Sequence, residues 1–238
     1  MIFDKKQLAP MVLALAFCAC GGELASPAAR ALHHYLSKPA YVDPAAFKTA
    51  AFPPPPAADS EAQKADLALV LDRQEKRTEA ECAGARVTAG AGYRFFWGDK
   101  SPFPAPLPGE VKDFFRRLDY DAGESVTALK DRFRRPRPFN AYTEVRPCVK
   151  KSAGYSYPSG HSSCAWLFAL VLGDIIPARR AEFIKRADEI AMDRVTGGVH
   201  YPSDVAAGKV FGDAFHAELL KSPAYLGDIE RMKTLLAK

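Results

Sequence analysis

The sequence predicts an all-α fold, a single-domain helical bundle with long Pro/Gly-rich loops. Three observations lead to this prediction. Apolar residues recur at helical spacing through much of the chain, few segments alternate in the manner of β-strands, and 19 prolines and 16 glycines interrupt the periodic segments. With 238 residues, 48% of them hydrophobic and 26% charged, the chain is long enough to bury one sizeable core.

Residues 1–22 have the layout of a secretory signal peptide. Lys5 and Lys6 precede an apolar run, residues 8–20, and small residues follow it. The run is too short to cross a membrane comfortably, so the sequence predicts export to the periplasm. The stretch "CACGG" leaves open a lipoprotein signal with Cys20 as the lipidated residue, and only in that case do we expect membrane attachment.

The segment after the signal, residues 23–59, is rich in Pro and Ala and precedes the helical domain, residues 60–238. Its four consecutive prolines, residues 53–56, favour a stiff polyproline II conformation. Ser60 then has the position of a helix N-cap, and residues 61–82 have the composition of one long helix.

The rest of the chain divides into loops and helices. Residues 92–110 are aromatic and rich in Gly and Pro, which indicates an irregular loop. Residues 110–133 favour two helices broken near 121–123, and recurrent prolines make residues 134–160 mostly loop. Further helices are predicted at about 161–175, 178–195, 202–221 and 226–236.

The charge distribution and the cysteines bear on three questions: a nucleic-acid partner, a disulfide and a metal site. The net charge of +5 fits anionic substrates, but Lys and Arg are spread along the chain, so we expect no nucleic-acid partner. A Cys82–Cys148 disulfide is possible in an oxidising compartment. No CxxC pair or short His/Cys cluster occurs, and we therefore expect no metal site.

Three clusters of polar residues stand out within the helical pattern. In the first, "KDRFRRPRP", Lys130 and Arg137 are seven positions apart and Pro138 follows. So many charges in one stretch usually belong to a solvated helix end. We interpret the remaining arginines of the cluster in that way: Arg132, Arg134 and Arg135.

The second cluster is the turn "PSGH", which leads directly into an apolar helix. Unpaired N–H groups and the helix dipole at such an N-terminus form a natural anion site, and Gly160 permits close approach. His161 then lies where it can give a proton to a bound group. Taken alone, the cluster favours the simpler explanation, Ser159 as an N-cap beside an incidental histidine.

The third cluster, "DRVTGGVHYPSD", contains Arg194, His200 and Asp204. Pro202 suits the first turn of a helix that Tyr201 caps, so the Asp204 carboxylate can reach back to the His200 ring. A carboxylate on one imidazole nitrogen makes the other nitrogen a better nucleophile. A partly buried histidine and a helix N-terminal aspartate are the alternative explanation.

Together the clusters resemble the signature of the type 2 phosphatidic acid phosphatase and vanadium haloperoxidase superfamily. That signature is Lys, six residues, Arg-Pro; then Pro-Ser-Gly-His; then Ser-Arg, five residues, His, three residues, Asp. Only the Ser is missing, because Asp193 occupies its position. From about Tyr41 to its C-terminus the chain resembles a bacterial class A non-specific acid phosphatase, which implies a helical bundle of the type 2 phosphatidic acid phosphatase kind.

The resemblance implies an exported acid phosphatase that hydrolyses phosphomonoesters with broad specificity and without a cofactor. His200 is then the nucleophile that becomes a phosphohistidine, Asp204 orients it, and His161 protonates the leaving group. We expect His200 to be unprotonated and His161 protonated in the free enzyme. The phosphate is expected to bind to Lys130, Arg137, Ser159, Gly160 and Arg194.

Several questions stay open at the level of the sequence. Transfer of phosphate to alcohols and a homodimer are both compatible with the resemblance. A vanadium-dependent haloperoxidase and an exported phosphate-binding protein with an inactive site are the alternative functions. The Asp193 carboxylate beside Arg194 either weakens phosphate binding or points away from the phosphate.

Overall fold

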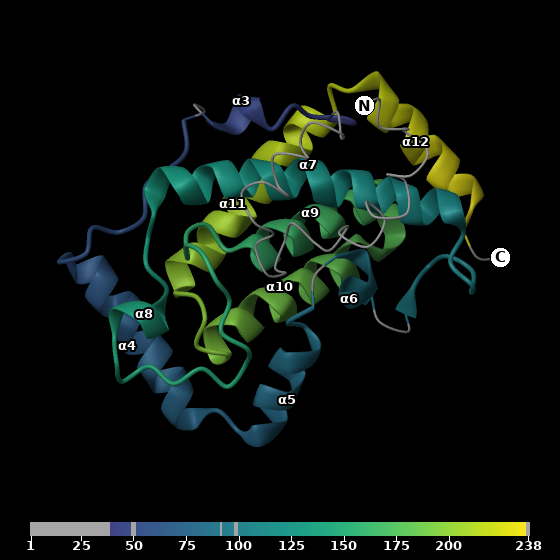
Figure 1. Ribbon diagram of the computed structural model, residues 1–238. Helices are drawn as coiled ribbons and strands as arrows, with labels where there is room; N and C mark the ends of the chain where they lie inside the picture. Colours follow the sequence, from purple (N-terminus) through teal and green to yellow (C-terminus); the bar gives the residue numbers. More distant parts are fainter. Residues whose placement is uncertain (1–38, 49–50, 91, 98–99, 237–238) are drawn as a thin grey trace, which may run out of the picture.

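The computed structural model describes residues 39–48, 51–90, 92–97 and 100–236. The described residues form helices and loops without a strand, which confirms the predicted fold class (Figure 1). The signal-like residues 1–22 and Cys20 lie outside the described residues. No helix within the described ranges is both long enough and apolar enough to cross a membrane.

The central helix is α9, Gly160–Ile175, and thirteen of its sixteen residues are buried. It contacts α10, Arg180–Thr196, and α11, Pro202–Leu219, more extensively than any other described element contacts its neighbours. A Cβ atom on Gly208 of α11 would lie 2.7 Å from Cβ of Ser162. The absence of a side chain at Gly208 therefore lets the N-terminal ends of α9 and α11 approach closely, and both ends carry candidate site residues.

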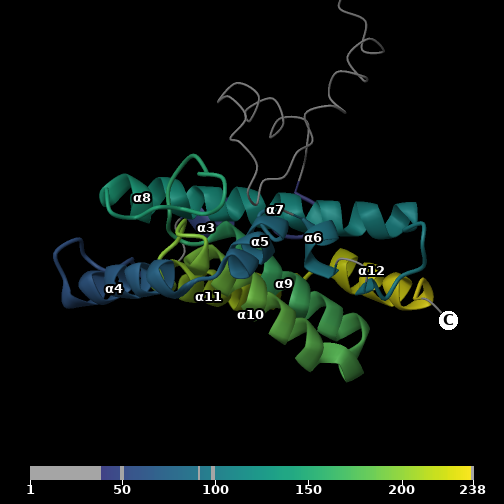
Figure 2. The same cartoon turned by 90° about the horizontal axis from the view of Figure 1, so that it is seen from below.

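The 25-residue helix α7, Gly109–Phe133, lies across one face of the α9–α11 layer (Figure 2). The predicted break near 121–123 is wrong, because Asp121 serves a tertiary contact and does not end the helix. Its buried carboxylate accepts hydrogen bonds from the backbone N–H groups of residues 40–42 at 2.8–3.2 Å. The helix thus continues while Asp121 binds the N-terminal segment.

The described part of the Pro/Ala-rich segment packs onto the helical domain. Phe47, in the short helix α3, Ala45–Lys48, lies with its ring centroid 5.3 Å from that of Phe211. Phe52 is also buried, and the Tyr157 hydroxyl donates to the Pro53 carbonyl at 2.7 Å. Aromatic packing and this hydrogen bond hold the segment beside the loop that precedes α9.

The predicted helix 61–82 is two helices, α4, Glu61–Lys76, and α5, Glu79–Val87. Ser60 caps α4 as expected, but Thr78 starts a second helix through a capping box with Glu81. Cys82 of α5 forms a disulfide with Cys148. The disulfide attaches α5 to the long loop between α7 and α9.

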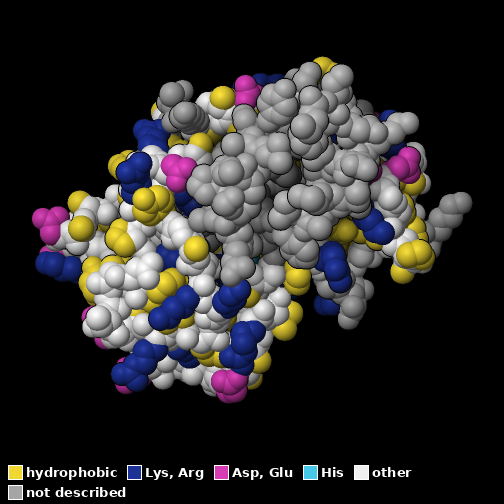
Figure 3. Space-filling view, viewed as in Figure 1, with side chains coloured by type: hydrophobic (Ala, Val, Ile, Leu, Met, Phe, Trp, Pro, Cys, Tyr) yellow, Lys and Arg dark blue, Asp and Glu magenta, His cyan; other side chains and the backbone are white. Residues whose placement is uncertain are grey.

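The remaining elements follow the prediction with small differences. The loops predicted at 92–110 and 134–160 contain the short helices α6, Tyr93–Trp97, and α8, Pro138–Ala141. The 3₁₀ turn η2, Pro177–Arg179, precedes α10, and α12, Pro223–Thr234, ends the described chain. On the part of the face in Figure 3 that the described residues form, several Lys and Arg side chains lie at the lower centre and left, separated by hydrophobic and other residues.

Candidate active site

The His200–Asp204 pair lies where α11 begins. Nδ1 of His200 is 3.1 Å from Oδ2 of Asp204, and the same carboxylate oxygen accepts the Tyr201 N–H at 2.9 Å. The Ser156 hydroxyl also donates to this oxygen. Since the fully buried carboxylate can only accept here, the His200 proton resides on Nδ1.

Nε2 of His200 carries the lone pair. Arg137 Nη1 lies 3.0 Å from it, and a guanidinium has no acceptor, so the arginine donates to this nitrogen. Burial and the positive charges of Arg137 and Lys130 lower the pKa of His200 well below its ordinary value, although Asp204 acts in the opposite direction. The ring is thus neutral, and its Nε2 lone pair accepts the hydrogen bond from Arg137.

Arg135 belongs to the site's interior, and its interpretation as part of a solvated helix end is wrong. Arg134 ends α7 in the left-handed conformation, with φ of 50°, and this reversal turns Arg135 inward. Arg135 is only 6% exposed and donates to Asp204 Oδ1 at 2.6 Å and to Asp66 Oδ2 of α4 at 2.7 Å. Its guanidinium also lies over the Tyr201 ring at 4.0 Å. Arg132 and Arg134 are exposed, as expected.

Lys130 and Arg137 converge on the loop before α9 from either side of the α7–α8 turn. Lys130 Nζ donates to the Tyr155 carbonyl at 2.7 Å, and burial together with Arg137 lowers its pKa to about 7. Arg137 donates to the carbonyls of Gly154 and Val199 at 3.2 and 3.0 Å. Backbone carbonyls therefore orient both cations without neutralising them.

Arg194, in the last turn of α10, is the third buried cation. Its Nη2 donates to the Ala85 carbonyl at 2.5 Å and to the Thr88 hydroxyl at 2.9 Å. Thr88 in turn donates to Asp193 Oδ2 at 2.6 Å, so the Asp193 carboxylate points toward α5. Nε of Arg194 is buried without a hydrogen-bond partner among the described residues, which leaves a donor for a bound anion.

Ser159 and Gly160 lie at the start of α9. The Ser159 hydroxyl caps the helix by accepting the Ser162 N–H, and the Ser159 N–H donates to the Asp204 carbonyl at 2.9 Å. The capping interpretation is therefore correct for the acceptor side of this hydroxyl, and its proton can still be donated to an anion. The backbone bond to Asp204 joins the N-terminus of α9 to that of α11.

His161 follows in the first turn of α9. Its Nε2 lies 3.1 Å from the Ala89 carbonyl, which requires a proton on that nitrogen. Burial lowers the pKa of His161 to about 3, and Arg194, Arg137 and Lys130 add to the decrease. This direction runs against the expectation of a protonated His161 in the free enzyme, because burial and three nearby cations all disfavour the charged ring.

Residues of all three predicted clusters lie close enough together for Lys130, Arg137 and Arg194 to act on His161. Four residues that hydrogen-bond within this site were not assigned to it from the sequence: Arg135, Ser156, Thr88 and Asp66. A proline after Arg135 was the one available sign that this residue leaves the helix. Hydroxyls such as those of Ser156 and Thr88 are too common to be recognised without the fold. Within the described ranges, no group of three His, Cys, Asp or Glu residues is arranged to bind a metal ion.

A helical bundle with a buried histidine–aspartate pair beneath converging cations defines a class of enzymes that act on phosphate-like anions. The PAP2 superfamily model matches residues 122–227, a stretch that contains all three clusters. The chain belongs to the PAP2 superfamily and, within it, to the non-specific acid phosphatases. It is 30% identical to the non-specific acid phosphatase of Providencia stuartii over 86% of this chain and 85% of that protein.

Other comparisons agree on the fold. The chain is 33% identical to the non-specific acid phosphatase of Salmonella typhimurium over 46% of this chain and 45% of the relative. A solved bacterial vanadium-dependent iodoperoxidase superposes with a TM-score of 0.58 at 21% identity, covering 75% of this chain and 53% of that one. The chain therefore spans about half the length of this haloperoxidase, and the likeness concerns the fold alone.

Proposed function

We propose that this chain hydrolyses phosphomonoesters through a phosphohistidine formed on His200. The observation that carries the proposal is the arrangement of Arg137, His200 and Asp204, in which a buried neutral imidazole has its proton on Nδ1 and its Nε2 lone pair toward Arg137. A phosphate-binding protein without catalysis needs the cations but has no use for a nucleophile of defined tautomer.

In the first step, a phosphate oxygen replaces the His200 ring as the acceptor for Arg137. The freed Nε2 of His200 then attacks phosphorus, and the bond to the ester oxygen breaks. The Asp204 carboxylate stabilises the imidazolium-like charge that develops on the ring. Lys130, Arg137 and Arg194 bind the three equatorial oxygens, whose charge must be stabilised while the P–O bond breaks. These cations supply the charge that a metal ion would otherwise provide, so we propose turnover that does not depend on a metal.

The leaving oxygen takes a proton from His161. Since burial and nearby cations lower the pKa of His161, the proton arrives with the substrate, as the acidic proton of a phosphomonoester monoanion. The charge of the bound phosphate then favours protonated His161. In the second step His161 accepts a proton from water, whose oxygen attacks the phosphohistidine and releases phosphate. An alcohol in place of water gives phosphotransfer.

We also propose that the protein is exported to the periplasm. The signal-like pattern of residues 1–22 supports export, and the Cys82–Cys148 disulfide is typical of an oxidising compartment.

The decisive experiment measures phosphate release from p-nitrophenyl phosphate with and without EDTA. A base-quenched reaction with radiolabelled substrate then tests for an alkali-stable phosphoenzyme in the wild type and in His200→Ala. We expect turnover in EDTA and a phosphoenzyme in the wild type only. Phosphate binding without release would indicate an inactive site, and halide oxidation with vanadate and peroxide without phosphate release would indicate a haloperoxidase.

A further inference from the structure

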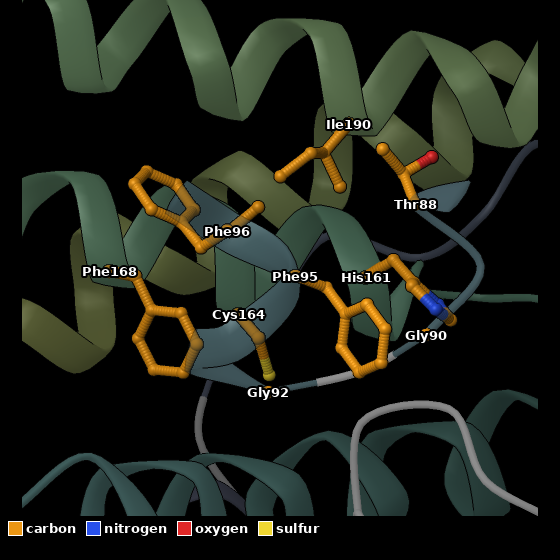
Figure 4. A pocket seen from close by; sticks show the side chains of 10 residues that line it. Thr88, Gly90, Gly92, Phe95, Phe96, His161, Cys164, Phe168 and Ile190 are labelled. Carbon is orange, nitrogen blue, oxygen red and sulfur yellow. The ribbon is translucent and has the colours of Figure 1, made fainter. Parts of the chain in front are cut away.

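An apolar pocket adjoins His161 on the side of α6. Its walls include Phe95, Phe96, Phe168 and Ile190, which contribute no charge (Figure 4). The pocket is narrow and opens to solvent; about 290 Å³ of free space lies within it and in the solvent at its mouth. Because His161 forms part of the wall, the pocket is continuous with the place where a leaving group is protonated.

Phe95 lines this pocket, and the residue is 40% exposed. The ring lies directly against Gly90, where an added Cβ would be 2.2 Å from Cε1 of Phe95. Only a residue without a side chain permits this position of the ring. Gly90 follows Ala89, whose carbonyl holds His161, so one short turn positions both the aromatic ring and the imidazole.

The position of Phe95 is also set from α10. Arg186 donates to the backbone carbonyls of Phe96 at 2.8 Å and Phe95 at 3.3 Å. These bonds attach the short helix α6 to α10, next to the pocket residue Ile190. The pocket is thus built from elements held by specific contacts.

We propose that this pocket is the leaving-group subsite and that it selects phosphomonoesters of alcohols with an apolar, preferably aromatic, substituent. The inference rests on the proposed function. In an in-line reaction the ester oxygen faces His161, opposite the attacking His200, and its substituent continues away from the phosphate. Beyond His161 that substituent meets phenylalanine rings, which favour an aromatic ring and offer nothing to a charged or sugar-like group.

The test compares benzyl phosphate with methyl phosphate, whose leaving alkoxides are of similar basicity and therefore require the same help from His161. We expect wild-type kcat/KM to be higher for the benzyl ester. Phe95→Ala should lower the benzyl-to-methyl ratio roughly tenfold. Gly90→Ala should lower it as well, because its Cβ displaces the Phe95 ring. Leu226→Ala, at a 47% exposed position of α12, is the matched control and should keep the wild-type ratio.

Calorimetric binding of benzylphosphonate and methylphosphonate, which are not hydrolysed, separates the two proposals. Tighter binding of benzylphosphonate that disappears in Phe95→Ala supports the subsite even if neither ester is hydrolysed, in which case the proposed function fails. Turnover of both esters with equal binding of the two phosphonates overturns the subsite and leaves the phosphatase intact. An unchanged ratio in both Phe95→Ala and Gly90→Ala overturns it as well.

Discussion

Nη1 of Arg137 lies 3.0 Å from Nε2 of His200, on the side of the ring opposite the Asp204 carboxylate. This contact places the permanent positive charge of the Arg137 guanidinium next to Nε2, the ring nitrogen that does not carry the proton. The carboxylate fixes the proton on Nδ1, and the guanidinium keeps Nε2 unprotonated. The lowered pKa of His200 therefore favours the neutral ring in acidic solution, where a free histidine would be charged, as the proposed nucleophilic role requires.

Replacing Asp204 should lower both kcat and the free energy of unfolding. Burial raises the pKa of this carboxyl, but the hydrogen bond from His200 and the charge of Arg135 bring it to about 2. In Asp204→Asn the His200 tautomer is no longer held and Arg135 loses one carboxylate. We expect kcat to fall by about 10²–10⁴-fold and the free energy of unfolding to fall by about 3 kcal/mol.

Steady-state kinetics and urea unfolding measure these two effects. Asp188→Asn is a suitable control, because Asp188 is paired with Lys209 near the surface and should change neither quantity much. A fully active Asp204→Asn enzyme would show that His200 does not depend on this carboxylate.

The loss of activity caused by replacing His161 should depend on the leaving group of the substrate. p-Nitrophenolate departs with little protonation, whereas an alkoxide requires a proton from an acid. We expect His161→Ala to lose roughly 10²–10⁴-fold in kcat/KM on an alkyl phosphate and far less on p-nitrophenyl phosphate. His216→Ala, which removes a histidine bound to Asp174 away from the site, is the control. Equal losses on both substrates would argue against His161 as the acid.

Lys130 should limit activity on the alkaline side. Burial and Arg137 lower the pKa of its ammonium group to about 7, so the group is charged below that pH and neutral above it. The phosphate site therefore loses one positive charge as the pH rises through 7, and kcat/KM should decline. In Lys130→Arg the guanidinium stays charged, and the decline should move to higher pH.

The pH profile of kcat/KM with one substrate tests this prediction, because the ionisation of the substrate is the same for both enzymes. Lys209→Arg serves as the control for a lysine-to-arginine change outside the site. Superimposable profiles of the wild type and Lys130→Arg would exclude Lys130 as the titrating group.

Thr88 should act on phosphate affinity through Arg194. Its hydroxyl accepts from Arg194 Nη2 and donates to Asp193, so the valine of nearly equal shape removes both bonds. We expect Thr88→Val to raise KM and the inhibition constant of inorganic phosphate about 5- to 10-fold, with a smaller change in kcat, since one hydrogen bond to a charged group is lost. Thr234→Val on α12 should leave both constants unchanged. A loss confined to kcat would contradict a role in binding.

Local patterns were sufficient for much of this protein. The start of α11 follows from Tyr201 and Pro202, because capping preferences depend on neighbouring residues. The position of Asp204 four residues after His200 likewise predicts their contact. The break between α4 and α5 was missed because helix-forming composition continues through Arg77, and only the capping box at Thr78 interrupts it.

The all-α class, a helix start near Gly160 and one at Pro202, and the residue types suited to phosphate chemistry could all be predicted from the amino-acid sequence. How these groups interact could not. Whether Arg135 is solvated depends on the reversal at Arg134, and the lowered pKa of His161 depends on burial and on Lys130, Arg137 and Arg194. The physical reason is range: capping and helical periodicity involve residues a few positions apart, whereas burial and electrostatic fields sum over segments that only the fold brings together.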